Sequence, residues 1–497
     1  MTPQVEDERL AGGAVGAGPA GWSNRLERLL GWADRDLGLA ALGLALLPAF
    51  LLMAPPSLWD PNEEDYLALA FRKVAPAAFP AYSAVFDQAN ARFLSNLVLG
   101  LPVAWLGYEP AHLLLRVAGA VLYALAFAAL LRSLRLGLLD GLAALALFGL
   151  LGPDLMGGEW LFFDAEPKTF AYAFVFLAIA AGVRDRWLWA AVSVAVATYF
   201  HFLVGGFWAA WLCVFHLALH RRWRSSVTLG GLYALATAPL LAVVVLDQVR
   251  GAAPVPPGGP SADYIYTILR NPHHLAPFSV PGKLHRWVSG AVATAALMAG
   301  ATWVALRRRG LLRALAAMVA GCCAWLLLAL AASWPDRATG ALGKLYLFRP
   351  SSLTLLLACL AAAMLAREAL PRGTANLVRR LVALGAVALF AWHAAHADAK
   401  AGREQRLSPA MRDAVAAVRR ITAPGDVVMV EPVDDFRFPY VRMERLLDRP
   451  TLVSWKFVPT NAAEIYRWWD LWRLRLRLFD AGCAGGTAGI PIRYLLV

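Results

Sequence analysis

Charged side chains are scarce in this sequence. Asp, Glu, Lys and Arg make up 16% of its 497 residues, against about 25% in a soluble domain, and 59% of the residues are hydrophobic. This deficit argues against an ordinary soluble protein and favours a membrane protein with several spans. The formal net charge of +13 does not indicate nucleic acid as a partner. Lys and Arg also collect in the cytoplasmic loops of membrane proteins, so we expect no nucleic-acid partner.

Cysteine is also rare. Four of the five cysteines lie within apolar runs and the fifth lies in the polar tail, so no disulfide framework is implied. A secretory signal is not recognisable, because the polar start of the chain lacks the short basic segment of such signals. We therefore expect residues 1–36 to form a cytoplasmic tail and the first apolar run to be retained.

Apolar runs recur along the chain at the length of a membrane span, which is about 20 residues. Eleven such runs lie near residues 37–57, 113–131, 140–156, 169–183, 187–200, 203–219, 226–247, 287–306, 311–332, 351–366 and 378–397. The fifth and sixth are short, and His201 with Gly205 and Gly206 supplies the break between them. The sequence predicts a mainly α-helical, polytopic transmembrane bundle of about eleven spans within residues 37–397.

Basic residues orient these spans. With the N-terminus in the cytoplasm, the cytoplasmic segments hold about 19 Lys and Arg and the longer outer loops about 11. This bias predicts a multi-pass protein of the cell membrane with a cytoplasmic N-terminus. An odd number of spans then places residues 398–497 outside the cytoplasm.

The segment 398–497 has a different composition. Ser408 and Pro409 are typical of a helix start, and "DVVMV", "TLVSW" and "RYLLV" are typical of buried strands. Helices alternating with strands predict a small extracytoplasmic α/β domain, which contains no Gly-rich phosphate loop. The helix around Trp468 and Trp469 could also lie on the membrane surface.

Two carboxylates and an ammonium stand directly before one apolar run, in "FDAEPKTF". Pro167 disfavours a helical conformation at Glu166, so Asp164 and Glu166 are expected in extended backbone and on one side of it. Lys168 in the first helical turn is not favoured by the helix dipole and calls for an anionic partner. Paired carboxylates suit a divalent cation such as Mg²⁺ or Mn²⁺, and the ammonium suits a phosphate. The alternative is a hydrated helix cap with an incidental salt bridge.

A second acidic group follows the first apolar run. "DPNEEDYLALAF" places Asp60, Glu63, Glu64 and Asp65 in a long outer loop. Such a cluster is also typical of a solvated helix start.

Further polar residues fall on the same predicted side. His201 lies at the break between two spans, His273 and His274 lie in a long outer loop, and Lys344 and Arg349 precede the tenth run. Each has a structural alternative: a histidine at a helix end is commonly structural, adjacent histidines without HExxH spacing are a weak metal signal, and an arginine at a span end can snorkel. Their shared side makes them candidates for one site.

The layout resembles the GT-C glycosyltransferases, polytopic enzymes that use polyprenyl-phosphate sugars and include protein mannosyltransferases and catalytic oligosaccharyltransferase subunits. "EEDYLALA" at 63–70 is similar to the acidic-pair-then-Tyr pattern of their first outer loop, with Glu63 where Asp is usual. "FDAEPKTF" resembles the D-x-E of the second loop in the oligosaccharyltransferase branch. "RWWDLW" at 467–472 contains the letters of that branch's acceptor motif but lies in an expected helix. The chain resembles bacterial inner-membrane members without an assigned acceptor most closely.

The resemblance implies transfer of a hexosyl or pentosyl group from a polyprenyl-phosphate-linked donor, at the outer membrane face, to a glycan, lipid or protein acceptor. It implies three sets of residues: a general base from the first loop (Glu63, then Glu64, then Asp60), a metal pair (Asp164 and Glu166) and donor-phosphate ligands (Lys168 and Arg349).

The main alternative is a transporter or flippase of a lipid or lipid-linked sugar. Transporters keep substrate sites near the bilayer midplane, with interrupted helices in matching halves and charges inside the membrane. Arg116 is the best intramembrane charge, and no internal repeat is evident. A structural protein whose outer domain binds a partner would explain the tail but not the acidic pairs.

Overall fold

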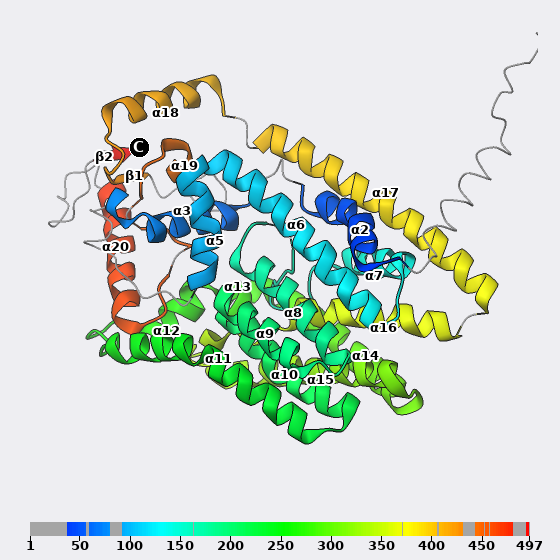
Figure 1. The fold of residues 1–497 in the computed structure, drawn as a ribbon. Helices are drawn as coiled ribbons and strands as arrows, with labels where there is room; N and C mark the ends of the chain where they lie inside the picture. Colours follow the sequence, from blue (N-terminus) through cyan, green and yellow to red (C-terminus); the bar gives the residue numbers. More distant parts are fainter. Residues whose placement is uncertain are drawn as a thin grey trace, which may run out of the picture.

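The computed structural model describes residues 37–55, 59–79, 92–162, 164–369, 371–404, 407–430, 443–451, 453–456, 458–480 and 494–496. Within these ranges the chain is mainly helical (Figure 1). The helices are α2 Leu39–Met53, α3 Pro61–Val74, α5 Phe93–Leu106, α6 Tyr108–Ser133, α7 Leu138–Leu151, α8 Pro167–Val183, α9 Trp187–Phe200, α10 Phe202–His220, α11 Trp223–Arg250, α12 Ala262–Tyr264, α13 Pro272–Leu275, α14 Leu284–Arg307, α15 Gly310–Asp336, α16 Ser351–Ala369, α17 Arg372–Glu404, α18 Pro409–Ile421, α19 Met443–Leu447 and α20 Ala462–Asp480. A π-helical segment, Ile265–Arg270, joins α12 to α13.

Each predicted apolar run overlaps a helix along most of its length. Seven of the described helices are long and apolar enough to cross a membrane: α6, α10, α11, α14, α15, α16 and α17. The other four runs form α2, α7, α8 and α9, which have between 14 and 17 residues, and α5 is a further short apolar helix that was not expected. The structure therefore supports seven spans, and the count of eleven is not confirmed.

The outward-facing sides of the long helices are apolar. In α11 and α14, 17% and 11% of the most apolar 18-residue stretch is buried. Leu235 on α11 is 73% exposed and Leu306 on α14 is 82% exposed. Apolar surface of this extent is costly in water and is satisfied by lipid.

Aromatic rings fill the core between α2, α6 and α8. Phe50 contacts Phe127 and Phe162 edge to face, with ring planes at 83° and 84°, and Tyr123 contacts Phe176 in the same way. The Tyr123 hydroxyl donates a hydrogen bond of 2.6 Å to the carbonyl of Leu161. This bond ties the segment that precedes Asp164 to the centre of the bundle.

The break at His201 is confirmed. Helix α9 ends at Phe200, and the ring of His201 caps α10 by accepting a hydrogen bond from the backbone of Val204 at 3.5 Å. The two helices then pack so closely that a side chain at Gly205 would lie 2.1 Å from the hydroxyl of Thr198. Glycine is needed there for the close approach.

A separate C-terminal α/β domain is not confirmed. Two short strands, β1 Val428–Val430 and β2 Tyr494–Leu496, form a parallel pair. The described residues of the strand predicted at 451–455 form none, because the carbonyls of Val453 and Ser454 accept hydrogen bonds from side chains of α20 instead. Helix α17 also runs unbroken across the predicted boundary at residue 397.

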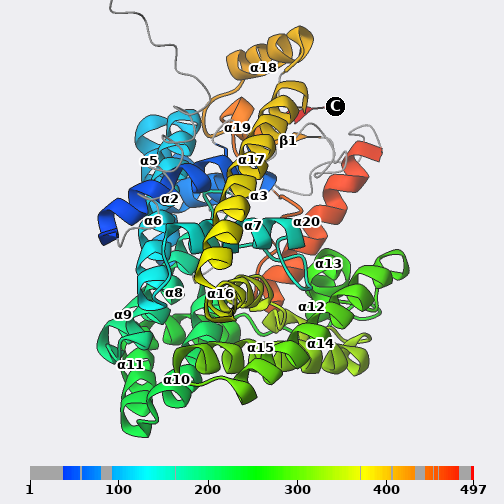
Figure 2. The same cartoon turned by 90° about the vertical axis from the view of Figure 1, so that its right-hand side faces the viewer.

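The C-terminal elements share a core with segments that lie between the long helices in the sequence. Met429 and Trp468 pack in one buried cluster with Phe79, Tyr266 and Leu275. Trp468 is 1% exposed, so it does not lie on a membrane surface. Figures 1 and 2 both place α18 and α19 at one extremity of the molecule and α10, α14 and α15 toward the other. The C-terminal segment thus covers one end of the helical bundle.

Candidate functional site

Glu63 is held by an arginine and a histidine. Its carboxylate accepts hydrogen bonds from Arg116 at 2.6 to 3.1 Å and lies 3.0 Å from Nδ1 of His112. Burial alone raises the pKa of Glu63, but Arg116 and His112 outweigh that effect and lower it to about 2. One carboxylate oxygen also accepts from the backbone of Ala165 at 3.2 Å, which connects Glu63 to the second acidic motif. A carboxylate so engaged is a weak proton acceptor.

Glu64 is engaged by the C-terminal segment. Arg445 on α19 donates to the Glu64 carboxylate at 2.8 Å and also pairs with Glu109 at the start of α6. The guanidinium stacks over the ring of Trp59, 4.3 Å from its centroid. Arg445 therefore docks α19 onto α3, and Glu64 is its main buried anchor, at 1% exposed.

Three other carboxylates, those of Asp60, Asp164 and Glu166, lie close enough to influence one another's charge. Both oxygens of Asp164 and Oε1 of Glu166 are buried and have no hydrogen-bond partner among the described residues. Burial raises the pKa of Asp164 well above its usual range, and the charges of Glu166 and Asp60 raise it further. Burial also raises the pKa of Glu166, against the opposing effect of Lys168. Asp60 caps α3 through a 2.8 Å bond from the backbone of Asn62.

Glu159 joins the two predicted phosphate ligands. Its carboxylate lies 2.7 Å from Nη1 of Arg349 and 3.6 Å from Nζ of Lys168. Lys168 also lies 3.5 Å from Glu166 and over the ring of Trp160. Lys168 and Arg349, 181 residues apart in the sequence, thus both contact Glu159.

Two glycines shape the turn that presents Glu159. Gly157 and Gly158 have φ angles of +90° and +63°, which residues with a side chain rarely adopt. A side chain at Gly157 would also lie 2.7 Å from Cβ of Phe348. His274 donates a hydrogen bond of 2.6 Å from Nδ1 to the Gly157 carbonyl, so the turn is fixed from outside.

A cavity of about 390 Å³ opens beside these residues. Its wall includes the aromatic rings of Tyr66, Trp160, Tyr266 and Tyr346. Among the described residues that line this cavity, one is acidic, Glu166, and seven are basic. The basic residues are Lys73, Arg92, Lys168, Arg270, Lys344, Arg349 and Lys456. Such a lining selects an anion.

A larger cavity, of about 960 Å³, lies next to the first and contains Asp60. Trp160, His274 and Lys456 line both cavities and form the wall between them. Asp60 lines the larger cavity together with Lys283 and Arg286, and the basic residues of the first cavity other than Lys456 line that cavity alone.

The three predicted histidines lie in the linings of these cavities, His201 buried and His273 and His274 half-buried. Burial lowers the pKa of His201 well below its usual range, and Arg349 and Arg92 lower it further. Burial lowers the pKa of His273 to about 3, with a further contribution from Arg270. Burial and the neighbouring His273 lower the pKa of His274 in the same direction. His201 caps α10 and His274 fixes the turn at Gly157, so these two histidines position elements of the site.

Four functional candidates were missed by sequence reasoning: Glu159, Arg92, Arg270 and Lys456. Glu159 stands five residues before Asp164, and its charge in an apolar stretch was a usable signal. Arg270 donates to the backbone of Trp455 and Lys456, which orders that C-terminal segment over the cavity. Burial and Arg270 lower the pKa of Lys456 to about 8. No local pattern marks Lys456 as a neighbour of residues that lie nearly three hundred positions earlier.

The predicted metal pair has suitable chemistry. Unsatisfied carboxylate oxygens of Asp164 and Glu166 are the hard ligands that Mg²⁺ or Mn²⁺ prefers. Among the described residues, however, the one group of three acidic or histidine side chains with ligand atoms within 4.8 Å of one another is a different one, Asp185 with His216 and His220. A cation between Asp164 and Glu166 would take its remaining ligands from elsewhere.

Comparisons of the chain with protein-family models, with curated proteins and with solved structures found no match. The function is therefore argued from the site itself.

Proposed function

We propose that the chain is a membrane glycosyltransferase of GT-C type that transfers a sugar from a polyprenyl-phosphate-linked donor to an acceptor. The observation that carries the proposal is the basic cavity beside the buried carboxylates of Glu166, which pairs with Lys168, and Asp164, which has no hydrogen-bond partner among the described residues, at one end of an apolar helical bundle. In this proposal the N-terminus is cytoplasmic, the C-terminal segment and the site are extracytoplasmic, and the short apolar helices complete the set of spans.

The basic cavity accommodates the donor phosphate. Arg349 and Lys168 are 6% and 5% exposed. The carboxylate of Glu159 contacts both and offsets the repulsion between their positive charges. As the bond between the sugar and the phosphate breaks, negative charge grows on the leaving phosphate. Fixed cations in a buried site stabilise that charge without reorganisation. The aromatic walls suit the apolar and sugar parts of the same ligand.

Asp60 is the general base that the geometry favours. Glu63 and Glu64 were the first choices from sequence, but Arg116 and Arg445 engage their carboxylates. Asp60 lines the larger cavity, which meets the basic cavity at Trp160, His274 and Lys456. An acceptor hydroxyl held there loses its proton to Asp60 while its oxygen attacks the anomeric carbon. The phosphate leaves with the bonding electron pair, and attack from the opposite face inverts the configuration.

Asp164 and Glu166 would hold the divalent cation, which as a Lewis acid would offset charge on the donor phosphate. Glu166 lines the basic cavity, whereas Asp164 faces a small void beside Arg116 and Thr169. Burial raises the pKa of both carboxyls. A cation bound between them would oppose this effect, because a nearby positive charge favours the ionised form of a carboxyl.

The alternative is a flippase for the same class of lipid. Its strongest sequence feature was the intramembrane charge of Arg116, but Arg116 is 7% exposed and paired with Glu63. Three of the cavity residues lie at helix ends: Glu166 directly precedes α8, His201 separates α9 from α10, and Arg349 precedes α16. A site at helix ends suits chemistry at the membrane interface better than alternating access at the midplane.

The test is transfer by the purified full-length protein. Polyprenyl-phosphate sugars are supplied in detergent with Mg²⁺ or Mn²⁺, and release of polyprenyl phosphate is measured for wild type, Asp164→Asn, Glu166→Gln and Arg349→Gln. We expect each variant to lose transfer while remaining folded, and a chelator to abolish wild-type transfer. Arg308→Gln is the control, because Arg308 pairs with Glu368 on a half-exposed surface.

Movement of the lipid across a vesicle bilayer without cleavage of the sugar–phosphate bond would replace the enzyme by the flippase. Full transfer by Asp164→Asn and Glu166→Gln, with chelator harmless, would reduce that pair to a helix cap.

A further inference from the structure

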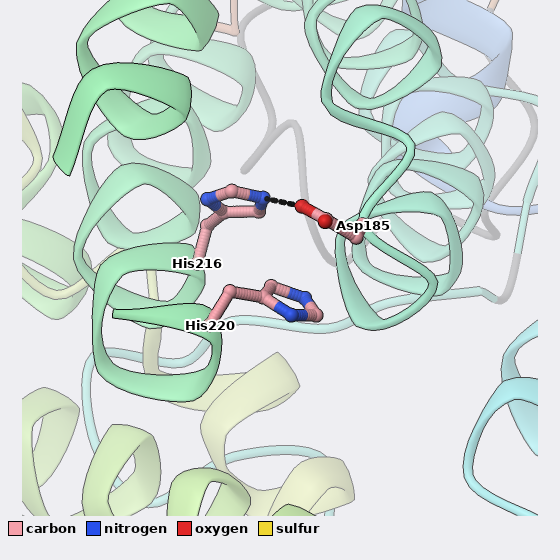
Figure 3. A group of neighbouring side chains, drawn as sticks. All are labelled: Asp185, His216 and His220. Atoms are coloured by element: carbon pink, nitrogen blue, oxygen red, sulfur yellow. Dashed lines mark hydrogen bonds and ion pairs between the residues drawn. The ribbon is translucent and has the colours of Figure 1, made fainter. Parts of the chain in front are cut away.

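Two histidines and an aspartate face one another at the end of the bundle that lies away from the cavities. Asp185 follows α8, and His216 and His220 lie one turn apart near the end of α10 (Figure 3). Helix α8 has 17 residues, so this end lies roughly 25 Å along the helix from Glu166. The proposed glycosyl transfer uses none of the three residues.

The spacing of the three side chains matches a small metal site. One ligand atom from each lies within 4.8 Å of the others. Nε2 of His216 is 3.1 Å from Oδ1 of Asp185. Ligand bonds of 2.0–2.1 Å at tetrahedral angles place two ligand atoms about 3.3 Å apart. The first pair is therefore already at a ligand-to-ligand distance, and the ligand atom of His220 lies within 4.8 Å of both.

Each of the three residues has a partner on the atom that faces away from the others. Nε2 of His220 donates to the carbonyl of Gly182 at 2.7 Å, which leaves its Nδ1 with a free lone pair. Nδ1 of His216 lies 3.0 Å from the Ser226 hydroxyl, which leaves Nε2 for a metal. Oδ2 of Asp185 pairs with Arg222. Outer hydrogen bonds of this kind orient metal-binding histidines and carboxylates.

The backbone conformation at Asp185 also supports this arrangement. Asp185 has φ of +58°, a left-handed conformation that aspartate and asparagine tolerate better than most residues. The turn joins α8 to α9, and the histidines belong to the last turns before α11. His216 is fully buried, so its polar ring atoms depend on these partners.

We propose that Asp185, His216 and His220 bind Zn²⁺, with a water or another small ligand in the fourth position. Two imidazoles and one carboxylate are a donor set that zinc accepts, and three protein ligands leave one position open. The bound ion ties the α8–α9 turn to the end of α10 and so fixes the ends of four helices. The proposal is independent of the glycosyltransferase assignment.

The test measures metal binding by the full-length protein, purified in detergent through an affinity tag that contains no histidine. After chelation and dialysis against Zn²⁺, metal content is determined for wild type, Asp185→Asn, His220→Ala and the control His393→Ala. Asp185→Asn keeps the left-handed turn and an acceptor oxygen, so its fold is retained. His393 is an exposed histidine of α17 outside the cluster.

We expect about one zinc per chain in wild type and in His393→Ala. We expect affinity at least roughly tenfold weaker in Asp185→Asn and in His220→Ala. Co²⁺ should give the visible absorption of a tetrahedral site in wild type, and Zn²⁺ should raise the melting temperature of wild type and His393→Ala more than that of Asp185→Asn and His220→Ala. Equal zinc content and affinity in wild type, Asp185→Asn and His220→Ala, or no zinc in folded wild type, would overturn the proposal.

Discussion

The guanidinium of Arg116 donates to both carboxylate oxygens of Glu63, between α6 and α3, with neither side chain more than 7% exposed. The pair joins a candidate membrane span to the helix that carries the first acidic motif. Because Glu63 also accepts from the backbone of Ala165, it connects that motif to the second one. The main role that follows for Glu63 is to hold the two acidic loops together.

Removal of either partner should be strongly destabilising. Arg116→Met leaves a buried carboxylate without its cation, and we expect a loss of about 3–5 kcal/mol in the free energy of unfolding. Glu63→Gln leaves the cation unpaired, with a similar cost. The double variant should lose less than the sum of the two, as measured by denaturation in mixed micelles. Glu368→Gln, which breaks the half-exposed Arg308–Glu368 pair, should change stability by less than about 1 kcal/mol.

Acid should weaken the fold through the same residue. The pKa of Glu63 falls from an ordinary 4.5 to about 2 in the folded protein, so its stabilisation is fully present above pH 4.5 and is lost as pH falls toward 2. Melting temperature measured down this range should fall more steeply for wild type than for Glu63→Gln. Identical slopes would show that Glu63 has an ordinary pKa when folded.

Asp60→Asn should separate binding from transfer. A general base contributes about 10²–10⁴-fold to rate and little to ground-state binding. We expect donor affinity near that of wild type and single-turnover transfer slower by at least roughly a hundredfold. Asparagine can still cap α3, so the fold is retained. Normal transfer by Asp60→Asn together with slow transfer by a folded Glu63→Gln or Glu64→Gln would return the role to the original choices.

Donor binding should depend on pH through Lys456. Its pKa of about 8 means that it is charged below pH 8 and neutral above it, whereas a phosphodiester keeps its negative charge throughout. Affinity for a polyprenyl-phosphate sugar should therefore fall as pH rises through 8, by at least roughly tenfold in total. Lys456→Arg should abolish this dependence, and Lys456→Met should bind weakly at every pH. A flat wild-type profile would contradict the assignment.

The position of the C-terminal segment can be tested with a reporter fused after Val497. The excess of basic residues on one side predicts activity only outside the cytoplasm. A reporter active in the cytoplasm would mean that the number of spans is even, and the predicted side of the whole site would invert.

The helices were predictable because a long apolar run indicates a span without information about the segments that pack against it. The break at His201 was predictable for a similar reason, since a polar ring and two adjacent glycines interrupt an apolar pattern locally. Helix α5 was missed because Ser95, Asn96 and Pro102 interrupt its apolar pattern. The strand at 451–455 was wrong because Arg475 and Trp468 take the carbonyls that a neighbouring strand would have used.

The candidate site was predictable only in part. Lys168 and Arg349 were identified by their charge next to apolar runs, and the structure brings them together through Glu159. That Glu63 is paired could not be read from sequence, because the pairing depends on how α3 and α6 turn against each other. The same limit applies to Lys456, whose neighbours are set by the packing of distant segments.

The parallel pairing of β1 with β2 has a consequence for biogenesis. Residues 494–496 pair with residues 428–430, and Met429 of that strand belongs, with the adjacent Val427, to the core shared with Tyr266. That core cannot close before residue 496 has left the ribosome, whereas the apolar helices can insert as they are synthesised. Contacts so distant in sequence also form slowly. A newly inserted chain should therefore pass through a long-lived state with its helices in place and its cavity uncovered, which is the stage at which chaperones and proteases would recognise it.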